Sequence, residues 1–199
     1  GGDHSISLGN LKAVAEKYGD IGVLQIDAHC DLREAYMGFA YSHASIMYNA
    51  LKEIPSLKRL VQIGVRDYSP AEWEEVKSND SRVLTYLDKD IRSRLFEGET
   101  WKLIAEEIVS NLPQQVYISF DIDGLDPKLC PYTGTPVPGG FEIEQLFYLF
   151  TKIIQSGRHI IGFDLTEIGI GDNGWDGNVG ARVLFKLCNL LIYNNSSAS

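Results

Sequence analysis

Short apolar runs alternate with amphipathic stretches along most of this chain. Five runs rich in β-branched residues predict strands at 21–26, 59–65, 82–86, 116–120 and 160–166. Apolar residues at three- and four-residue spacing predict helices at 8–18, 42–51, 70–76, 100–112, 141–155 and 181–193. Because strands alternate with helices, we predict an α/β protein, a three-layer α/β/α fold with a mainly parallel central sheet.

Turn-forming residues separate these elements. Ser5 or Ser7 is a candidate N-cap for the first helix, and Gly19 ends it. Loops are predicted at 32–41, 125–140 and 167–180, and a polar tail at 194–199. No internal repeat or linker divides the 199 residues, so we expect a single domain.

Potential metal ligands follow the first predicted strand, in the sequence Asp27-Ala28-His29-Cys30-Asp31. If the extended backbone continues, the two aspartates and the histidine share one face, and Cys30 packs on the other. Carboxylate and imidazole groups suit a divalent cation of borderline hardness. The alternative is two solvated turn aspartates and an unrelated histidine.

Similar residues follow other predicted strands. Asp121 and Asp123 come after the strand at 116–120, Glu167 after the strand at 160–166, and His4 lies in the glycine-opened N-terminal loop. Each has a simpler interpretation alone: a turn, a solvated acid or a loop histidine. The carboxyl ends of parallel strands meet at one edge, so these groups can converge. Four aspartates and two histidines favour two divalent cations, which would lower the pKa of a water to give a hydroxide nucleophile.

Composition narrows the range of partners. The net charge of −9 argues against nucleic acid and favours a small cationic substrate. No apolar run approaches the ~20 residues of a membrane span. Three scattered cysteines, Cys30, Cys130 and Cys188, favour a reducing compartment over a disulfide framework. We therefore expect a cytoplasmic protein.

Four segments carry a resemblance to a known family. They are Gly1-Gly2-Asp3-His4-Ser5, Asp27-Ala28-His29-Cys30-Asp31, Ser119-Phe120-Asp121-Ile122-Asp123-Gly124-Leu125-Asp126-Pro127 and Thr135-Pro136-Val137-Pro138-Gly139-Gly140. In this order they resemble the signature motifs of the ureohydrolases, the arginase and agmatinase family. The resemblance implies an arginase-like fold holding two Mn²⁺ ions. One ion would be bound by His4, Asp27, Asp31 and Asp121, and the other by Asp27, His29, Asp121 and Asp123.

The same resemblance implies catalytic roles. Asp31 would hold the nucleophile and relay its proton, His43 would protonate the leaving amine, and Glu167 would pair with the guanidinium group. Asp164 is the rival to Glu167, but strand alternation points it the other way. Cys30 replaces the threonine usual in the family, and its predicted direction makes it a packing residue.

The resemblance also suggests a substrate. The loop after Asp31, through Tyr36 and on to His43, looks more like that of agmatinases than of arginases. We therefore expect hydrolysis of agmatine to putrescine and urea, a step of polyamine biosynthesis. Arginase activity remains open, as does guanidinobutyrase activity, because Arg33 could pair with a carboxylate.

Family members also differ from this chain in length. Relatives begin upstream of the first motif, so residues 1–199 are expected to be a ureohydrolase domain lacking an N-terminal segment, and a non-catalytic truncated relative remains possible. Deacetylases of related fold use one zinc, and His4 and the second aspartate pair disfavour them. Relatives form trimers or hexamers, so we expect a homo-oligomer.

Overall fold

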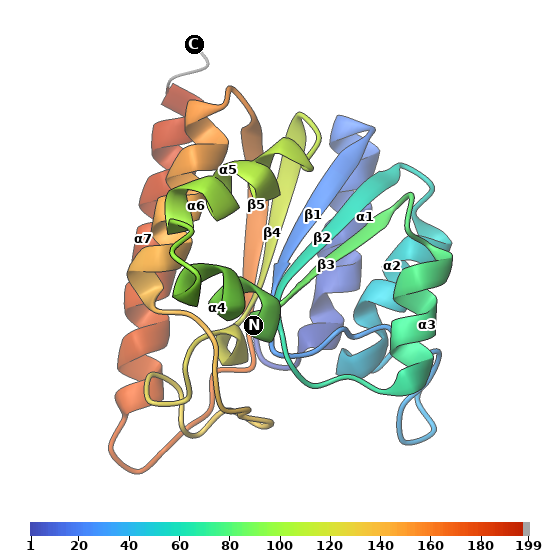
Figure 1. The fold of residues 1–199 in the computed structure, drawn as a ribbon. Coiled ribbons are helices and arrows are strands. Elements are labelled where there is room, and N and C mark those ends of the chain that lie inside the picture. Colours follow the sequence, from blue (N-terminus) through green and yellow to red (C-terminus); the bar gives the residue numbers. More distant parts are fainter. Residues whose placement is uncertain (197–199) are drawn as a thin grey trace.

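Five parallel strands form one sheet in the order β3-β2-β1-β4-β5 in the computed structural model, which describes residues 1–196 (Figure 1). The strands are β1 (Ile21–Ile26), β2 (Leu57–Val65), β3 (Val83–Leu87), β4 (Gln115–Asp121) and β5 (His159–Thr166). Each lies within two residues of its predicted bounds. Strands buried on both faces read as apolar runs, which is why the sequence locates them well.

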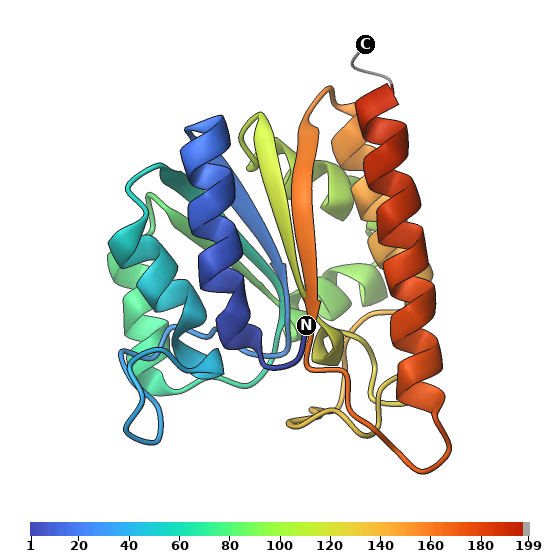
Figure 2. The same cartoon turned by 180° about the vertical axis from the view of Figure 1, so that it is seen from behind.

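Helices cover both faces of the sheet (Figures 1 and 2). One face carries α1 (Ser7–Tyr18), α2 (Ile46–Glu53) and α3 (Pro70–Ser78). The other carries α4 (Asp88–Phe96), α5 (Trp101–Ser110), α6 (Ile143–Gln155) and α7 (Trp175–Ser196). The predicted α/β/α fold is confirmed. Within residues 1–196, no helix has both the length and the apolar character that crossing a membrane requires.

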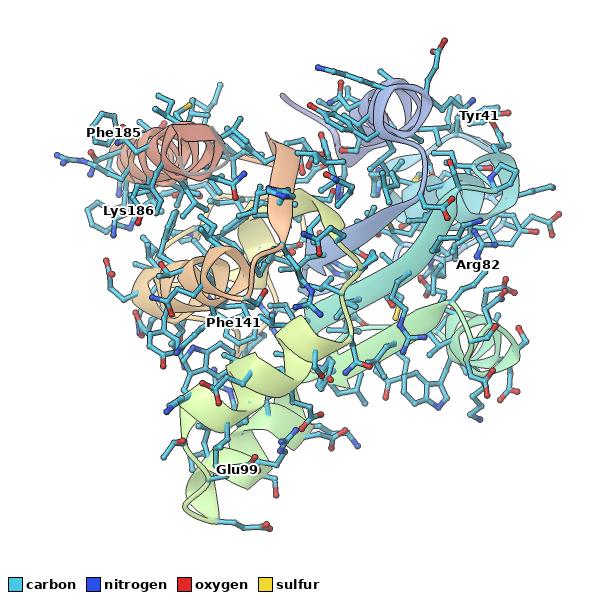
Figure 3. All side chains as sticks on the ribbon, turned by 90° about the horizontal axis from the view of Figure 1, so that it is seen from above. Tyr41, Arg82, Glu99, Phe141, Phe185 and Lys186 are labelled. Carbon is cyan, nitrogen blue, oxygen red and sulfur yellow. The ribbon has the colours of Figure 1, made fainter. Side chains whose placement is uncertain are left out.

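Alternate residues of each strand belong to two separate cores. On β1, Leu24 and Ile26 pack in the core under α4 to α7, whereas Ile21 and Val23 pack in the core under α1 to α3. Side chains fill both layers, while Phe185 and Lys186 lie on the outer side of α7 (Figure 3). The sheet is therefore held from both sides, and its strand ends have fixed positions.

The strand order changes direction at the centre of the sheet. The chain runs from β1 outward through β2 to β3, and then returns to place β4 against the other side of β1. In open parallel sheets this switch point, at the carboxyl ends of the strands, is where loops diverge and leave room for a site. The motifs after β1 and β4 meet here.

The helix starts differ from prediction at α1. Neither Ser5 nor Ser7 caps it; a short 3-10 helix, η1 (His4–Ile6), precedes it, and the Asp3 side chain caps η1 by accepting from the Ser5 amide. The end at Gly19 is confirmed, with φ of 76°. At α3, Ser69 and Glu72 form a reciprocal capping box ahead of the helix.

Helix α4 has no counterpart in the prediction, and α7 begins six residues before its predicted start. Only Ile91 and Asp88 of α4 are buried, so the sequence shows no apolar stripe there. In α7, the Asn173 side chain accepts from the Trp175 amide at the start. Gly180 lies inside the helix. A Cβ at this position would lie 2.5 Å from Ile168 Cδ1, so glycine allows the helix to pack closely against Ile168. Of the predicted tail, 194–196 is helical and 197–199 lies outside the described residues.

Substitutions at two glycines of α7 test whether this helix begins at Trp175, before its predicted start. Gly177→Ala should raise the free energy of unfolding by about 0.5–1 kcal/mol, because no atom lies within 4 Å of the new Cβ and alanine favours helix. Gly180→Ala is the matched control and should destabilise through its contact with Ile168. Urea unfolding measures both; a destabilising Gly177→Ala would contradict a helix that starts at Trp175.

Candidate metal centre

His4 lies at the centre of the first group of predicted ligands. Its Nδ1 is 3.0 Å from Asp31 Oδ2 and 3.3 Å from both Asp27 Oδ2 and Asp121 Oδ2. All four residues are buried, and among the described residues Nδ1 has no hydrogen-bond partner. A buried imidazole nitrogen facing three carboxylate oxygens has the donors that a divalent cation requires.

His29 forms a second group that shares Asp27. His29 Nδ1 is 3.3 Å from Asp27 Oδ1 and 3.1 Å from Asp123 Oδ2. The donor atoms of His4, Asp27 and Asp121 lie within 4.8 Å of one another, as do those of Asp27, His29 and Asp123. Asp27 thus turns one oxygen to each imidazole. The residues fit two cations bridged by Asp27; the part of Asp121 in the second group stays a prediction.

N–H donors hold an oxygen of Asp27, of Asp121 and of Asp123. Asp27 Oδ1 accepts from the His29 amide at 2.7 Å, and Asp27 Oδ2 accepts from Gln25 Nε2 at 2.8 Å. Asp123 Oδ1 accepts from the Ala28 amide at 3.0 Å, and Asp121 Oδ1 from the Asp123 amide at 2.9 Å. The ligand geometry is therefore set before any cation binds.

Asp31 reaches the group in a way that strand alternation does not predict. β1 ends at Ile26, and Asp31 has a left-handed backbone with φ of 53°. Its carbonyl accepts from the Met47 and Tyr48 amides at the start of α2, which holds this conformation. Cys30 lies in the apolar core as expected, and burial raises the pKa of its thiol.

The Asp-Gly pair after β4 forms a turn and also carries a candidate metal ligand. Asp121 ends β4, and Asp123 lies in the short 3-10 helix η3 (Ile122–Gly124). A Cβ on Gly124 would lie 2.6 Å from Ile26 Cγ2 and 2.9 Å from the Asp27 amide nitrogen. Glycine at this position lets the two ligand-bearing segments come into contact.

Crowding of the acids changes their protonation. Burial, and then the neighbouring Asp27, raise the pKa of Asp31 to about 7. Burial and Asp123 raise the pKa of Asp121 well above its usual value. Burial alone would lower the pKa of His29, but Asp123 and Asp27 outweigh it and raise this pKa to about 11. Asp31, Asp121 and His29 therefore each hold a proton more tightly than the free side chain does.

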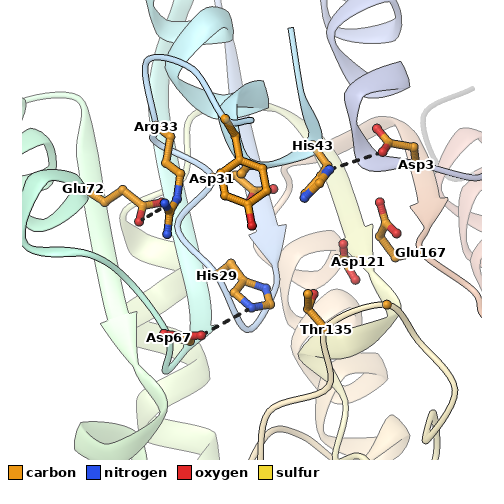
Figure 4. A pocket seen from close by; sticks show the side chains of 13 residues that line it. Asp3, His29, Asp31, Arg33, His43, Asp67, Glu72, Asp121, Thr135 and Glu167 are labelled. Carbon is orange, nitrogen blue, oxygen red and sulfur yellow. Dashed lines mark ion pairs between the residues drawn. The ribbon is translucent and has the colours of Figure 1, made fainter. Parts of the chain in front are cut away.

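A cavity of about 270 Å³ opens above the centre (Figure 4). It is lined by His29, Asp31 and Asp121 of the centre and by His43 and Glu167. His43 lies in η2 (His43–Ser45), with Nδ1 3.3 Å from Asp3 Oδ2. Glu167 follows β5 with φ of 60°, its Oε1 accepts from the His4 amide, and burial raises its pKa. All eight residues selected from the sequence thus lie in or beside one site.

Comparisons with known proteins agree with this arrangement. The model of the arginase family matches residues 1–173. Proclavaminate amidinohydrolase of Streptomyces clavuligerus is 34% identical over 195 residues, covering 94% of this chain and 60% of that protein. Mitochondrial agmatinase of Gallus gallus is 35% identical over 199 residues, covering 94% of this chain and 54% of that protein. The chain belongs to the arginase family.

The solved structure of the Streptomyces clavuligerus proclavaminate amidinohydrolase superposes with a TM-score of 0.81 at 28% identity. The match covers 100% of this chain and 64% of that chain. The present chain thus spans a little over half the length of the curated relatives it matches. The predicted family and its arginase-like fold are confirmed.

Arg66 supports this arginase-family site and was missed from the sequence. Arg66 follows β2, and its Nη2 donates to the carbonyls of Asp123 at 2.6 Å and Leu125 at 3.2 Å. Its Nε donates to the Val137 carbonyl at 3.1 Å. Arg66 thereby joins the Asp123 turn to the proline-rich loop. A charged residue directly after an apolar run was the available signal.

Asp164 shows the direction predicted for it. Its Oδ1 accepts from Ser119 Oγ at 3.0 Å and from the Phe120 amide at 3.2 Å. It lies among buried groups of the sheet and not among the residues that line the cavity. Glu167 is therefore the acid after β5 that a substrate can reach.

Replacing Asp27 tests the shared ligand. We expect Mn²⁺ to raise the melting temperature of the native chain, because a cation that binds only the folded state stabilises it. Asp27→Asn should lose most of this increase, since both groups use its carboxylate. Glu72→Gln, which lines the same cavity but lies outside both groups, is the control and should keep it. Scanning calorimetry with and without Mn²⁺ measures the difference; equal increases in both variants would exclude Asp27 as a ligand.

Proposed function

We propose that this protein is a binuclear manganese hydrolase that cleaves a guanidino group to urea and an amine. The observation that supports this proposal most directly is the position of the Asp27 carboxylate between two imidazoles. His4 faces one of its oxygens, and His29 faces the other. The donors are carboxylates and imidazoles without a thiolate, which suits Mn²⁺ better than softer metals. Membership of the arginase family supports the same proposal.

Two Mn²⁺ ions, when bound, would supply a hydroxide nucleophile and stabilise negative charge in the transition state. Asp31 borders both the centre and the cavity, so it can accept a hydrogen bond from the nucleophile and relay its proton. Asp31 Oδ2 lies 3.0 Å from His4 Nδ1, and the Asp31 side chain also lines the cavity, which is the position that such a relay requires.

Glu167 and His43 stand on one side of the cavity (Figure 4). The carboxylate of Glu167 would pair with the guanidinium group and orient its carbon toward the centre. His43, 3.3 Å from Asp3, would donate a proton to the departing amine, which must leave as a neutral molecule. These two roles follow from the charge that each reacting group carries.

The opposite wall of the cavity supports agmatine as the substrate. Arg33 is its one lysine or arginine, and Arg33 Nε lies 3.5 Å from Glu72 Oε2. The Arg33 charge is therefore already paired, while Asp67 adds a further acid to this wall. An amine tail suits such a wall better than a carboxylate. The products would be urea and putrescine, a step of polyamine biosynthesis.

A guanidino acid is the second candidate. Arg33 lies over the Tyr36 ring at 5.0 Å, on the cavity wall, so a substrate carboxylate could compete with Glu72 for it. This pairing would favour guanidinobutyrate or, with its additional amine, arginine. The two candidates differ in the charge at the end of the substrate remote from the guanidino group.

We also propose a reducing, cytoplasmic setting and a homo-oligomeric state. Cys30, Cys130 and Cys188 are all free thiols, and the first two are buried. Leu184 and Phe185 are 45% and 67% exposed on α7, an apolar surface that association would cover. A trimer or hexamer is the expected assembly.

Urea release tests the proposed reaction. On the complete protein loaded with Mn²⁺, agmatine should yield urea, and Asp121→Ala should lose Mn²⁺ binding and turnover together because it removes a ligand of His4's group. Glu167→Gln is the control: it should keep Mn²⁺ and lower kcat/KM by about 10- to 100-fold, the loss of a charged hydrogen bond. Urea release retained by Asp121→Ala would contradict the metal assignment.

Arg33→Met tests the choice of substrate. If agmatine is the substrate, kcat/KM for agmatine should be unchanged or raised, because a cation is removed from the wall that receives the amine. If a guanidino acid is the substrate, its kcat/KM should fall by about 10-fold or more with the loss of a charged pair. Assays of agmatine, guanidinobutyrate and arginine side by side distinguish these outcomes.

A further inference from the structure

A row of polar side chains crosses the sheet just before the ligand-bearing strand ends. It contains one residue from each strand in lateral register: Thr85 on β3, Gln62 on β2, Gln25 on β1, Ser119 on β4 and Asp164 on β5. Gln62, Gln25 and Ser119 have no exposed surface. Burying polar groups in an apolar sheet is costly unless each is hydrogen-bonded. We call these five residues the polar row.

The first arm of the polar row ends on Asp27. Thr85 Oγ1 donates to Gln62 Oε1 at 2.7 Å, and Gln62 Nε2 donates to Gln25 Oε1 at 2.6 Å. Gln25 Nε2 then donates to Asp27 Oδ2 at 2.8 Å. Gln62 Nε2 also donates to the Cys30 carbonyl at 2.7 Å, so its amide has only one workable orientation. That orientation obliges Gln25 to present its NH₂ group to Asp27.

The second arm ends on His4. Ser119 Oγ donates to Asp164 Oδ1 at 3.0 Å, which uses the single hydrogen of the hydroxyl. Ser119 Oγ must therefore accept from His4 Nε2, 2.8 Å away. With Nε2 protonated, the lone pair of a neutral His4 is on Nδ1, which faces the three carboxylates. The second arm thus selects the tautomer that can bind a cation.

The two halves of the centre are supported differently. Both arms end on His4's side, on the imidazole itself and on the Asp27 oxygen that faces it. On the side of His29, backbone amides hold the ligands: His29 N donates to Asp27 Oδ1, and Ala28 N donates to Asp123 Oδ1. Side chains of the sheet therefore support the position beside His4, where one backbone amide, that of Asp123, also holds Asp121, whereas the position beside His29 depends on the main chain.

We propose that the polar row is a positioning device for the cation on His4's side. It sets the His4 tautomer and holds the Asp27 oxygen that faces His4, while the His29 amide holds the other Asp27 oxygen, so the row controls mainly the affinity for the cation on His4's side. This inference rests on the binuclear centre of the proposed function. Gln25, Gln62 and Ser119 are positioning residues, because none of them lines the cavity or belongs to either ligand group.

Mn²⁺ titration of the complete protein, stripped with EDTA, tests this. The native protein should bind two Mn²⁺ ions. Ser119→Ala cuts the second arm and Gln25→Leu cuts the first. Each should weaken one of the two binding steps by about 10- to 100-fold, the usual effect of losing a partner of a metal ligand. The other step should weaken by a clearly smaller factor, because backbone amides that these substitutions leave in place hold its carboxylates.

Single-site backgrounds identify which cation is affected. In His29→Asn, where the remaining cation lies beside His4, adding Gln25→Leu should weaken Mn²⁺ binding by about 10-fold or more. In His4→Asn, where the remaining cation lies beside His29, the same addition should weaken binding by a much smaller factor, because backbone amides hold Asp27 Oδ1 and Asp123 Oδ1 there. Equal weakening in both backgrounds, or none in either, would overturn the inference.

A double variant guards against a general loss of structure. Gln25→Leu leaves Gln62 Nε2 without one acceptor, whereas adding Gln62→Leu removes that donor and leaves Thr85 Oγ1 and the Cys30 carbonyl without their Gln62 partner. The double variant should show the same selective loss although its melting temperature in EDTA differs from that of Gln25→Leu, so the loss of binding does not follow overall stability. If the native protein bound fewer than two Mn²⁺ ions, the proposed function would fail; two ions with unaltered binding in every variant would overturn only the role of the polar row.

Discussion

Repulsion among four buried aspartates is the constraint on which this structure depends. Asp27, Asp31, Asp121 and Asp123 are each at most 5% exposed, and desolvated charges of one sign cannot be crowded together without compensation. The carboxyl ends of the parallel strands supply part of this compensation. Backbone amides just beyond the strands are not used in the sheet and can donate to carboxylates, as Ala28 N does to Asp123. Cations would supply the rest, so the folding of β1 and β4 side by side and the binding of metal are linked.

The gathering of these acids and imidazoles could be predicted because its signal is local. Acids and imidazoles repeat directly after apolar runs, and the strands that precede them are buried on both faces. The backbone that delivers Asp31 and Glu167 could not be predicted. Both have positive φ without being glycine, and distant partners hold them: the Met47 amide for the Asp31 carbonyl, and the Gly2 carbonyl for the Glu167 amide. A left-handed residue fixed from outside its own segment leaves no trace in the local pattern.

The polar row shows the same limit more sharply. Gln25 and Gln62 are visible in the sequence as polar residues within apolar strands, but their meaning depends on the register that pairs them across 37 positions. A shift of one residue would turn either side chain to the opposite face of the sheet. Sequence periodicity gives the face of each side chain but not its lateral neighbour, so the two chains of hydrogen bonds, one over β3, β2 and β1 and one over β4 and β5, become visible only in the folded sheet.

The centre and the wall of the cavity above it come from different parts of the fold. The residues proposed to carry out the reaction are therefore distinct from the residues proposed to select the substrate. Strand ends and their backbone amides hold the ligands, whereas the wall that carries Arg33 and Tyr36 comes from the loop at 32–41. Loops tolerate substitution far better than buried strand ends do. In the proposed reaction, the charge at Arg33 and Glu72 would therefore decide between substrates without any change in the residues of the centre.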